Sequence, residues 1–215
     1  MPRRVGAFDA IVLTGGRSSR LGSVAKAGLF YRRQTLLQRS LVAVRAARAI
    51  VVVGPEDSSE LSSRILTARE EPAYGGPAAG IAAGLTTIRS ASPIPAGATV
   101  VIACDMPHVG RAVPALITAF FRAQDFDGVI ALDDEGRRQP LAACYRTDAL
   151  ASAIARADRA GGLDSLSVSR LLESLALEEL PVPGRWTADV DTWEDAERLG
   201  IRRATTNHET SEERR

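Results

Sequence analysis

The sequence has little of what would point to several common classes of protein. Its net charge is only +1, from 27 Lys and Arg against 26 Asp and Glu, so composition gives no general reason to expect a nucleic-acid partner. No apolar run is long enough to span a bilayer, and residues 1–4 (MPRR) lead into a strand-like segment without the core of a signal peptide. We expect a cytoplasmic protein with neither a nucleic-acid nor a membrane partner.

Cysteine is also scarce. Cys104 and Cys144 are far apart and form no Cys-x-x-Cys pair, so we expect reduced, buried thiols. The 215 residues, 45% of them hydrophobic, suit one folded α/β domain over 1–203, a monomer or a weak homo-oligomer. The polar composition of 204–215 predicts a flexible charged tail.

Apolar runs alternate with segments of helical period. The predicted strands are 10–13, 49–53, 99–104 and 128–132, and the predicted helices between them are 35–47, 77–88 and 113–124. This alternation predicts βαβ units and a mainly parallel sheet covered on both faces. Further along, a turn at 133–136 predicts an antiparallel hairpin. The remaining predicted elements are a strand at 140–145, helices at 147–157 and 167–175, a short strand at 188–190 and a helix from Thr192.

The most informative segment is glycine-rich. Residues 13–22 read LTGGRSSRLG and begin where the first predicted strand ends, at the usual ligand edge of a parallel sheet. Paired glycines let backbone N–H groups approach a bound anion, and the serines and cations suit a polyphosphate. A plain turn with solvated arginines is the alternative. The nucleotide ligands predicted here are Leu13, Thr14, Gly15, Gly16, Arg17, Ser18, Ser19 and Lys26.

The loop is neither a P-loop nor a Gly-x-Gly-x-x-Gly motif, which disfavours NAD binding. It resembles the signature of the nucleotidyltransferases related to molybdenum cofactor guanylyltransferase, LAGGxxxRMG followed by DK. Thr14 stands for Ala, Leu21 for Met, and Ala25 for the Asp before the lysine. The resemblance covers about residues 8–200. It implies an α/β, Rossmann-like three-layer αβα fold of the nucleotide-diphospho-sugar transferase type.

Residues 99–107 read TVVIACDMP, an apolar strand that delivers one carboxylate at its C-terminal end. Taken alone, Asp105 is explained equally well as a turn residue or a helix cap. The family carries Cys-Asp-x-Pro here, and its Asp binds Mg²⁺ beside the nucleotide phosphates. The resemblance therefore implies Mg²⁺ as cofactor and Asp105 as its ligand. Magnesium needs only one or two carboxylates besides phosphate oxygens and water.

A second pair of carboxylates follows near the C-terminus, at Asp189 and Asp191. Many related nucleotidyltransferases have DxDTPED here, whereas molybdenum cofactor guanylyltransferases more often have NxNTPE; this chain has DVDTWED. The resemblance implies an acceptor or metal contact for both residues. The alternative is that Asp191 only caps the last helix together with Thr192.

Two further segments resemble the family. Residues 74–81 (YGGPAAGI) match a loop that enters a helix near the nucleobase, and an acidic residue beside the guanine corresponds to Glu70 or Glu71. Residues 139–141 (QPL) match a strand on the acceptor side. The predicted nucleotide ligands of these segments are Glu71, Gly76, Pro77 and Gly80, and the predicted acceptor ligand is Gln139.

The implied reaction moves GMP from GTP to the phosphate of molybdopterin and releases pyrophosphate. A phosphate monoester is largely dianionic near neutrality, with a second pKa of about 6, and needs no general base. The protein must align two anions and neutralise developing charge, which gives catalytic roles to Arg20, Lys26 and Asp105. The alternatives are molybdopterin cytidylyltransferase, phospholactate guanylyltransferase, sugar-phosphate nucleotidyltransferases and a nucleotide-binding relative without turnover.

Overall fold

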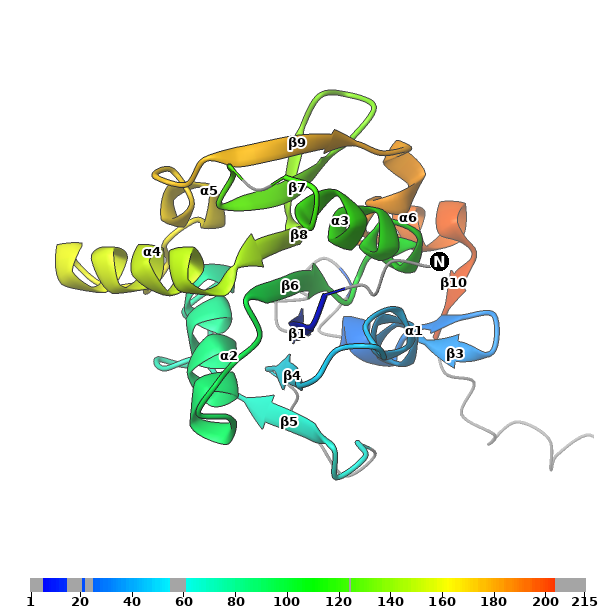
Figure 1. Cartoon of the computed structure of the whole chain (residues 1–215). Coiled ribbons are helices and arrows are strands. Elements are labelled where there is room, and N and C mark those ends of the chain that lie inside the picture. The colour runs from blue at the N-terminus through cyan, green and yellow to red at the C-terminus, as the bar shows by residue number, and fades with distance from the viewer. Residues whose placement is uncertain (1–5, 15–20, 22–24, 55–60, 124, 204–215) are drawn as a thin grey trace, which may run out of the picture.

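A seven-stranded sheet forms the centre of the computed structural model, which describes residues 6–14, 21, 25–54, 61–123 and 125–203 (Figure 1). The strand order is β5-β4-β1-β6-β8-β7-β9. The strands are β1 (Phe8–Leu13), β4 (Ile50–Val53), β5 (Ile65–Ala68), β6 (Ala98–Ala103), β7 (Gly128–Leu132), β8 (Arg138–Arg146) and β9 (Leu177–Pro181). β8 runs antiparallel to β6 and β7, and all other neighbours are parallel, which confirms the predicted sheet.

Helices cover both faces of this sheet, as Figure 1 shows. One face carries α2 (Pro77–Ala91), α4 (Thr147–Ala160) and α5 (Val168–Leu171), and the other carries α1 (Leu36–Ala43) and α3 (Val113–Phe120). Every residue of β1 and β6 is buried. Alternate residues of β1 join opposite cores, Ile11 with the α2 side and Val12 with the α3 side. The predicted three-layer αβα architecture is confirmed.

The reversed strand β8 contains an irregularity. Its ladder with β6 ends at Ala142, and its ladder with β7 resumes only at Gln139, so Pro140 and Leu141 pair with neither neighbour. Proline has no N–H to lose at such a bulge, and its carbonyl accepts a hydrogen bond from the Tyr145 hydroxyl at 2.8 Å. Because β8 is reversed, its first residues lie at the edge where the parallel strands end.

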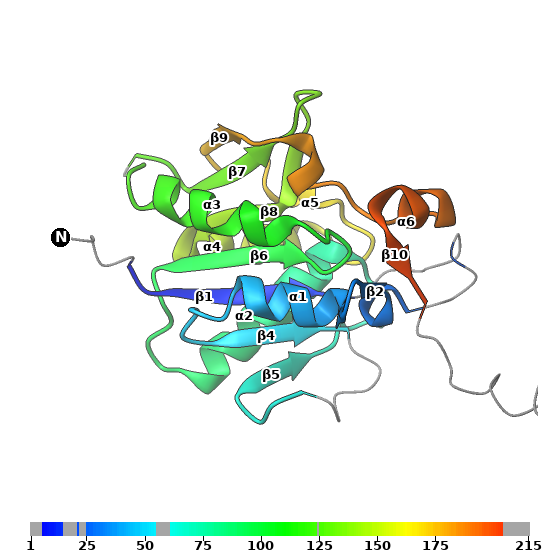
Figure 2. The ribbon, with the colours of Figure 1, turned by 90° about the vertical axis from the view of Figure 1, so that its right-hand side faces the viewer.

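A second, three-stranded antiparallel sheet has the order β10-β2-β3. It consists of β2 (Phe30–Tyr31), β3 (Gln34–Thr35) and β10 (Ile201–Arg202), and it lies beside α6 (Trp193–Leu199) in Figure 2. A small core joins residues 21–36 to residues 190–201: Leu21, Leu29, Leu36, Val190, Ala196 and Ile201 are all buried in it. This core brings the segment around η2 (Lys26–Gly28) next to the segment before α6.

Most predicted elements are confirmed, with differences at their ends. The helices predicted at 35–47, 113–124 and 167–175 end early, at Ala43, Phe120 and Leu171. The strand predicted at 188–190 is wrong: Val190 packs into the small core, and its N–H donates to the backbone carbonyl of Asp105 at 3.1 Å. The helix after Thr192 is confirmed, with its capping box.

Other predictions from the sequence have mixed outcomes. β5, β9 and the small sheet were not predicted. Cys104 and Cys144 are buried and unpaired, as expected, and burial raises the pKa of each thiol, that of Cys144 to about 12. The predicted tail at 204–215 lies outside the described residues. Within the described ranges, no helix has the length and apolar character needed to cross a bilayer.

Candidate active site

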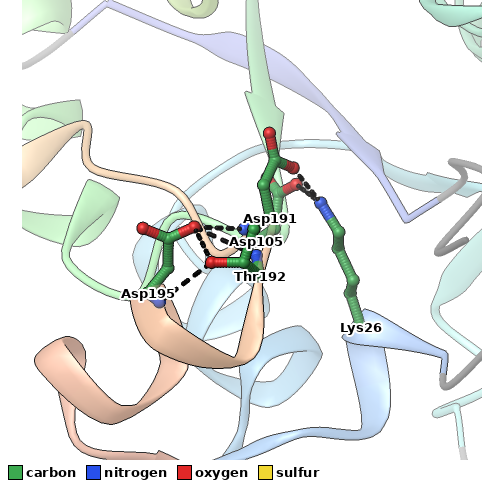
Figure 3. Close-up of polar contacts among 5 residues, drawn as sticks. All are labelled: Lys26, Asp105, Asp191, Thr192 and Asp195. Carbon is green, nitrogen blue, oxygen red and sulfur yellow. Dashed lines mark hydrogen bonds and ion pairs between the residues drawn. The ribbon is translucent and has the colours of Figure 1, made fainter. Parts of the chain in front are cut away.

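Three residues far apart in sequence meet at the carboxyl edge of the main sheet (Figure 3). The Lys26 Nζ atom lies 3.0 Å from Oδ2 of Asp105 and 2.5 Å from Oδ1 of Asp191. Asp105 follows β6, Lys26 begins η2 and Asp191 precedes α6. The small core and the Val190–Asp105 backbone hydrogen bond hold these segments together. We call Lys26, Asp105, Asp189 and Asp191 the ionic corner.

The ionic corner carries more negative than positive charge. Burial lowers the pKa of Lys26, but Asp105 and Asp191 together outweigh it and raise the pKa above its ordinary value. Nearby protein atoms remove part of the hydration of Asp189, and this raises its pKa; the charges of Asp105 and Asp191 raise it further. Three carboxylates against one ammonium leave two formal negative charges, so the corner favours a divalent cation.

Four residues from Asp191, another carboxylate has a structural role. Asp195 accepts hydrogen bonds from the Thr192 N–H and hydroxyl at 3.0 and 2.8 Å, and Thr192 in turn accepts from the Asp195 N–H at 3.1 Å. These bonds and Arg198 lower the pKa of Asp195 to about 2. The cap therefore belongs to Thr192 and Asp195, which leaves the side chain of Asp191 for the lysine.

A cavity of about 340 Å³ adjoins the ionic corner. Its wall includes residues at the ends of β1 and β6, one residue of β8 and the loop that enters α2. The lining residues are Leu13, Thr14, Lys26, Glu70, Tyr74, Gly76, Pro77, Ala103, Cys104, Asp105, Met106, Leu141 and Asp189. Thr14 is fixed by a hydrogen bond from its hydroxyl to the carbonyl of Val53 at 2.8 Å. One hollow thus joins the predicted phosphate, metal and nucleobase segments.

Of the two glutamates before the loop that enters α2, Glu70 lines the cavity, whereas the predicted ligand Glu71 is exposed and lines no part of it. Gly80 is buried in α2 behind the wall. A Cβ atom at Gly80 would lie 3.2 Å from Leu13 and 3.4 Å from a carboxylate oxygen of Glu70. Gly80 therefore makes room for Glu70, and it is not itself a lining residue.

The remaining predicted ligands divide into two groups. Gln139 lies at the first residues of β8, but its amide donates to Asp133 at 2.8 Å within the hairpin, and it does not line the cavity. The loop residues outside the described part of the chain are Gly15, Gly16, Arg17, Ser18, Ser19 and Arg20. Their assigned roles stay predictions.

The sequence assigned no ligand role to five lining residues, Tyr74, Ala103, Cys104, Met106 and Leu141. Tyr74 has a backbone φ of 64° and a largely exposed side chain, a combination uncommon for a bulky residue. Tyr74 precedes Gly-Gly-Pro and Met106 follows Asp105. Their positions next to these motifs are the one sequence signal that could have indicated a place in the cavity wall. Leu141 enters the cavity wall only through the bulge in β8.

A parallel sheet with one reversed strand and a charged corner at its carboxyl edge defines the class of α/β nucleotide-binding folds. Within that class, the MobA-like NTP transferase domain matches residues 10–177, and the chain belongs to this family. The comparisons with individual proteins agree with that membership.

Two curated relatives carry the name "Probable molybdenum cofactor guanylyltransferase". One, from Natronomonas pharaonis, is 29% identical over 90% of this chain and 97% of its own length. The other, from Methanosarcina mazei, is 32% identical over 64% of this chain, and the match spans 62% of its own length. Molybdopterin-guanine dinucleotide biosynthesis protein A from Archaeoglobus fulgidus has a similar structure, with a TM-score of 0.66 at 24% identity over 89% of this chain and 96% of its own. This likeness shows the shared nucleotidyltransferase fold.

Proposed function

We propose that the protein is a nucleotidyltransferase that moves GMP from GTP to the phosphate of molybdopterin and releases pyrophosphate. The observation that carries this proposal is the ionic corner, where Lys26 joins Asp105 and Asp191 beside a cavity large enough for a small ligand. The names of the relatives support guanylyl transfer and a molybdopterin acceptor.

The donor atoms at the ionic corner fit Mg²⁺. Hard carboxylate oxygens suit this ion, and it takes its remaining ligands from phosphate and water. Among the described residues, no group of three His, Cys, Asp or Glu side chains is arranged to hold a metal ion. Asp105 would hold the ion, and the nearby charges of Asp189 and Asp191 favour it there; when bound, it neutralises charge on the triphosphate.

The reaction needs alignment more than proton transfer. A phosphate oxygen of the acceptor forms a bond to the α-phosphorus of GTP, the bond from that phosphorus to the bridging oxygen breaks, and pyrophosphate leaves with the electron pair. The acceptor phosphate is already deprotonated near neutrality, so no general base is required. Asp105 and Asp191 fix the ammonium of Lys26 in place, which positions one cation for the triphosphate without further ordering cost.

Guanine recognition is the role we propose for Glu70. Its side chain is partly buried at the cavity wall and, among the described residues, has no hydrogen-bond or ion-pair partner. A carboxylate accepts from guanine N1–H and the exocyclic amine, donors that adenine lacks. A base that leaves such a carboxylate unpaired is penalised.

The test combines a nucleotide screen with a matched pair of variants. GTP with Mg²⁺ should raise the melting temperature more than ATP, CTP or UTP at the same concentration. The ligand that binds most tightly stabilises the folded state most, and a ligand at about 100 times its dissociation constant adds about 2.7 kcal/mol to stability. Glu70→Gln should weaken GTP binding about tenfold, the value of one charge-assisted hydrogen bond. Glu71→Gln is the control and should bind GTP like the parent.

The same proteins then enter a pyrophosphate-release assay with molybdopterin, phospholactate and sugar phosphates. Release with GTP and molybdopterin is the expected result. A larger thermal shift with CTP would move the proposal to cytidylyl transfer, and release only with another acceptor would replace molybdopterin. No response to any nucleotide would overturn nucleotidyl transfer.

A further inference from the structure

A ring pair on the other side of the Asp105 loop is surrounded by arginines. Tyr31 of β2 and His108 at the start of η3 (Val109–Arg111) pack edge to face, with ring centroids 5.1 Å apart. The Arg39 guanidinium lies 4.5 Å from the Tyr31 ring centroid, and that of Arg32 lies 5.5 Å from it. Both distances fit cation–π contacts, which hold the guanidinium groups in place.

Two more arginines complete this group. Arg111 ends η3, and Arg185 lies in η4 (Gly184–Trp186). Burial lowers the pKa of His108, and the charges of Arg39, Arg111, Arg185 and Arg32 lower it further. We call these four arginines and His108 the arginine cluster. Arg32 lies in the turn between β2 and β3, Arg39 lies in α1, and η3 and η4, which carry Arg111 and Arg185, contact each other.

No carboxylate of the described residues forms an ion pair with the arginine cluster. None of its four arginines forms an ion pair with any described residue, although Arg39 donates from Nε to the carbonyl of Pro107 at 2.9 Å. Ion pairs with an Asp or Glu are formed by Arg137, Arg138, Arg170 and Arg198; what distinguishes the arginine cluster is that Arg39 and Arg32 both lie over the ring of Tyr31, which packs against His108. Converging like charges repel, so an anion bound among them would gain favourable interactions with all four.

The arginine cluster is separate from the cavity at the ionic corner, since none of its residues lines that cavity. Arg39 instead lines a larger hollow of about 500 Å³, between α1 and α3. Met106 forms part of the wall of both hollows. The lining of the larger hollow is mostly apolar and contains two arginines and no acidic residue. This lining suits the organic part of an anion whose charged group contacts the arginines.

We propose that the arginine cluster is a second anion site, which binds a phosphate-class dianion or polyanion apart from the ionic corner. Guanidinium groups match phosphate oxygens with paired N–H donors, and a guanidinium stacked on an aromatic ring keeps its N–H edge free to donate. The site does not depend on the proposed nucleotidyl transfer. Inorganic phosphate, a phosphate monoester and pyrophosphate share the chemistry that it recognises.

Proton NMR of His108 is the direct test, because the chain has only two histidines, His108 and His208. A His208→Gln variant assigns the signal. Pyrophosphate should raise the pKa of His108 in a saturable way, since a bound anion offsets the arginine charges. The rise should persist in a Lys26→Ala background, where the ionic corner has lost its cation.

Two exposed arginines supply the test variants. Arg111→Gln and Arg185→Gln should each weaken pyrophosphate binding about tenfold, the value of one charge-assisted contact. Arg89→Gln, an exposed arginine of α2 far from the cluster in sequence, is the matched control and should bind like the parent. Equal melting temperatures check that each variant folds, and unchanged GTP binding separates this site from the ionic corner.

Comparing inorganic phosphate, phenyl phosphate and pyrophosphate shows which kind of anion the site prefers. Tighter binding of phenyl phosphate than of inorganic phosphate would show that the apolar hollow holds an organic group. Tighter binding of pyrophosphate than of both would point to the product of nucleotidyl transfer. The proposal is overturned if no phosphate probe moves the His108 signal, if Lys26→Ala abolishes the response, or if Arg111→Gln and Arg185→Gln respond like the parent.

Discussion

Asp191 and Asp195 stand four residues apart at the start of the same helix, and their surroundings differ completely. Asp195 accepts hydrogen bonds from Thr192 and forms an ion pair with Arg198, and these interactions lower its pKa to about 2. Asp191 is half exposed and reaches across to Lys26, which it shares with Asp105. One carboxylate is fully used by its own helix, and the other contributes to a cluster with excess negative charge.

The difference shows how a fold separates structural from chemical carboxylates. A carboxylate satisfied by its own helix contributes to stability and has little capacity left for a ligand. A carboxylate that shares one ammonium with its neighbours contributes little to stability, because partly exposed ion pairs are worth about 0–1 kcal/mol. Substitutions in the two groups should therefore have opposite effects, with activity lost in one and stability lost in the other.

Asp105→Asn should have the largest effect. Turnover should fall about a hundredfold or more, because neutralising charge on a transferring phosphoryl group is worth several kcal/mol. The melting temperature should change little, since Lys26 keeps its bond to Asp191. Steady-state pyrophosphate release at limiting Mg²⁺, with circular dichroism as the folding control, measures both. Parental turnover in this variant would exclude Asp105 as a metal ligand.

Lys26→Ala should come next. GTP binding should weaken about tenfold or more, because a positioned cation is lost beside the triphosphate. Asp105, Asp189 and Asp191 would then face one another without an ammonium, so Mg²⁺ should stabilise this variant more than it stabilises the parent. Calorimetric titration of GTP and thermal scans with and without Mg²⁺ measure these effects. Parental GTP affinity would show that the predicted phosphate role is wrong.

Asp195→Ala should have the smallest effect, and on stability alone. Loss of the cap should cost about 1 kcal/mol of unfolding free energy while turnover is retained. The folded pKa of about 2 lies below the ordinary 3.8, so the contribution of Asp195 is complete above pH 3.8 and is lost as the pH falls through 2. Urea unfolding of parent and variant at several acidic pH values measures it. A stability difference that stays constant down to pH 2 would contradict the assignment.

The sequence was most informative where local pattern decides structure. Continuous apolar runs predicted β1, β4, β6 and β7, and Thr192 predicted the start of α6. Strand β9 was missed because LEELP is short and charged and resembles a loop until β7 pairs with it. The extended run ADV at 188–190 resembled a strand, but tertiary packing placed Val190 in the small core.

The residues of the candidate site also differ in how far the sequence predicted them. Lys26 and Asp105 were predicted from the resemblance, since each stands at a fixed place in a motif. Two features of the site could be decided only from the three-dimensional structure. The choice between Glu70 and Glu71 depends on which side chain faces the cavity, and the choice between cap and site for Asp191 depends on Asp195 having already satisfied Thr192. The arginine cluster combines Arg32 and Arg39 with Arg111 and Arg185, which lie far from them in sequence, and no linear pattern connects them.

The bulge in β8 has a consequence for how this fold can change. Pro140 and Leu141 belong to neither ladder, and the ladders on both sides of them are complete without them. Leu141 nevertheless forms part of the cavity wall. A substitution at position 141 would therefore change the cavity wall and the packing against both cores without breaking a strand pair. Backbone pairing of the sheet is thus independent of residue 141, whereas the shape of the cavity depends on its side chain.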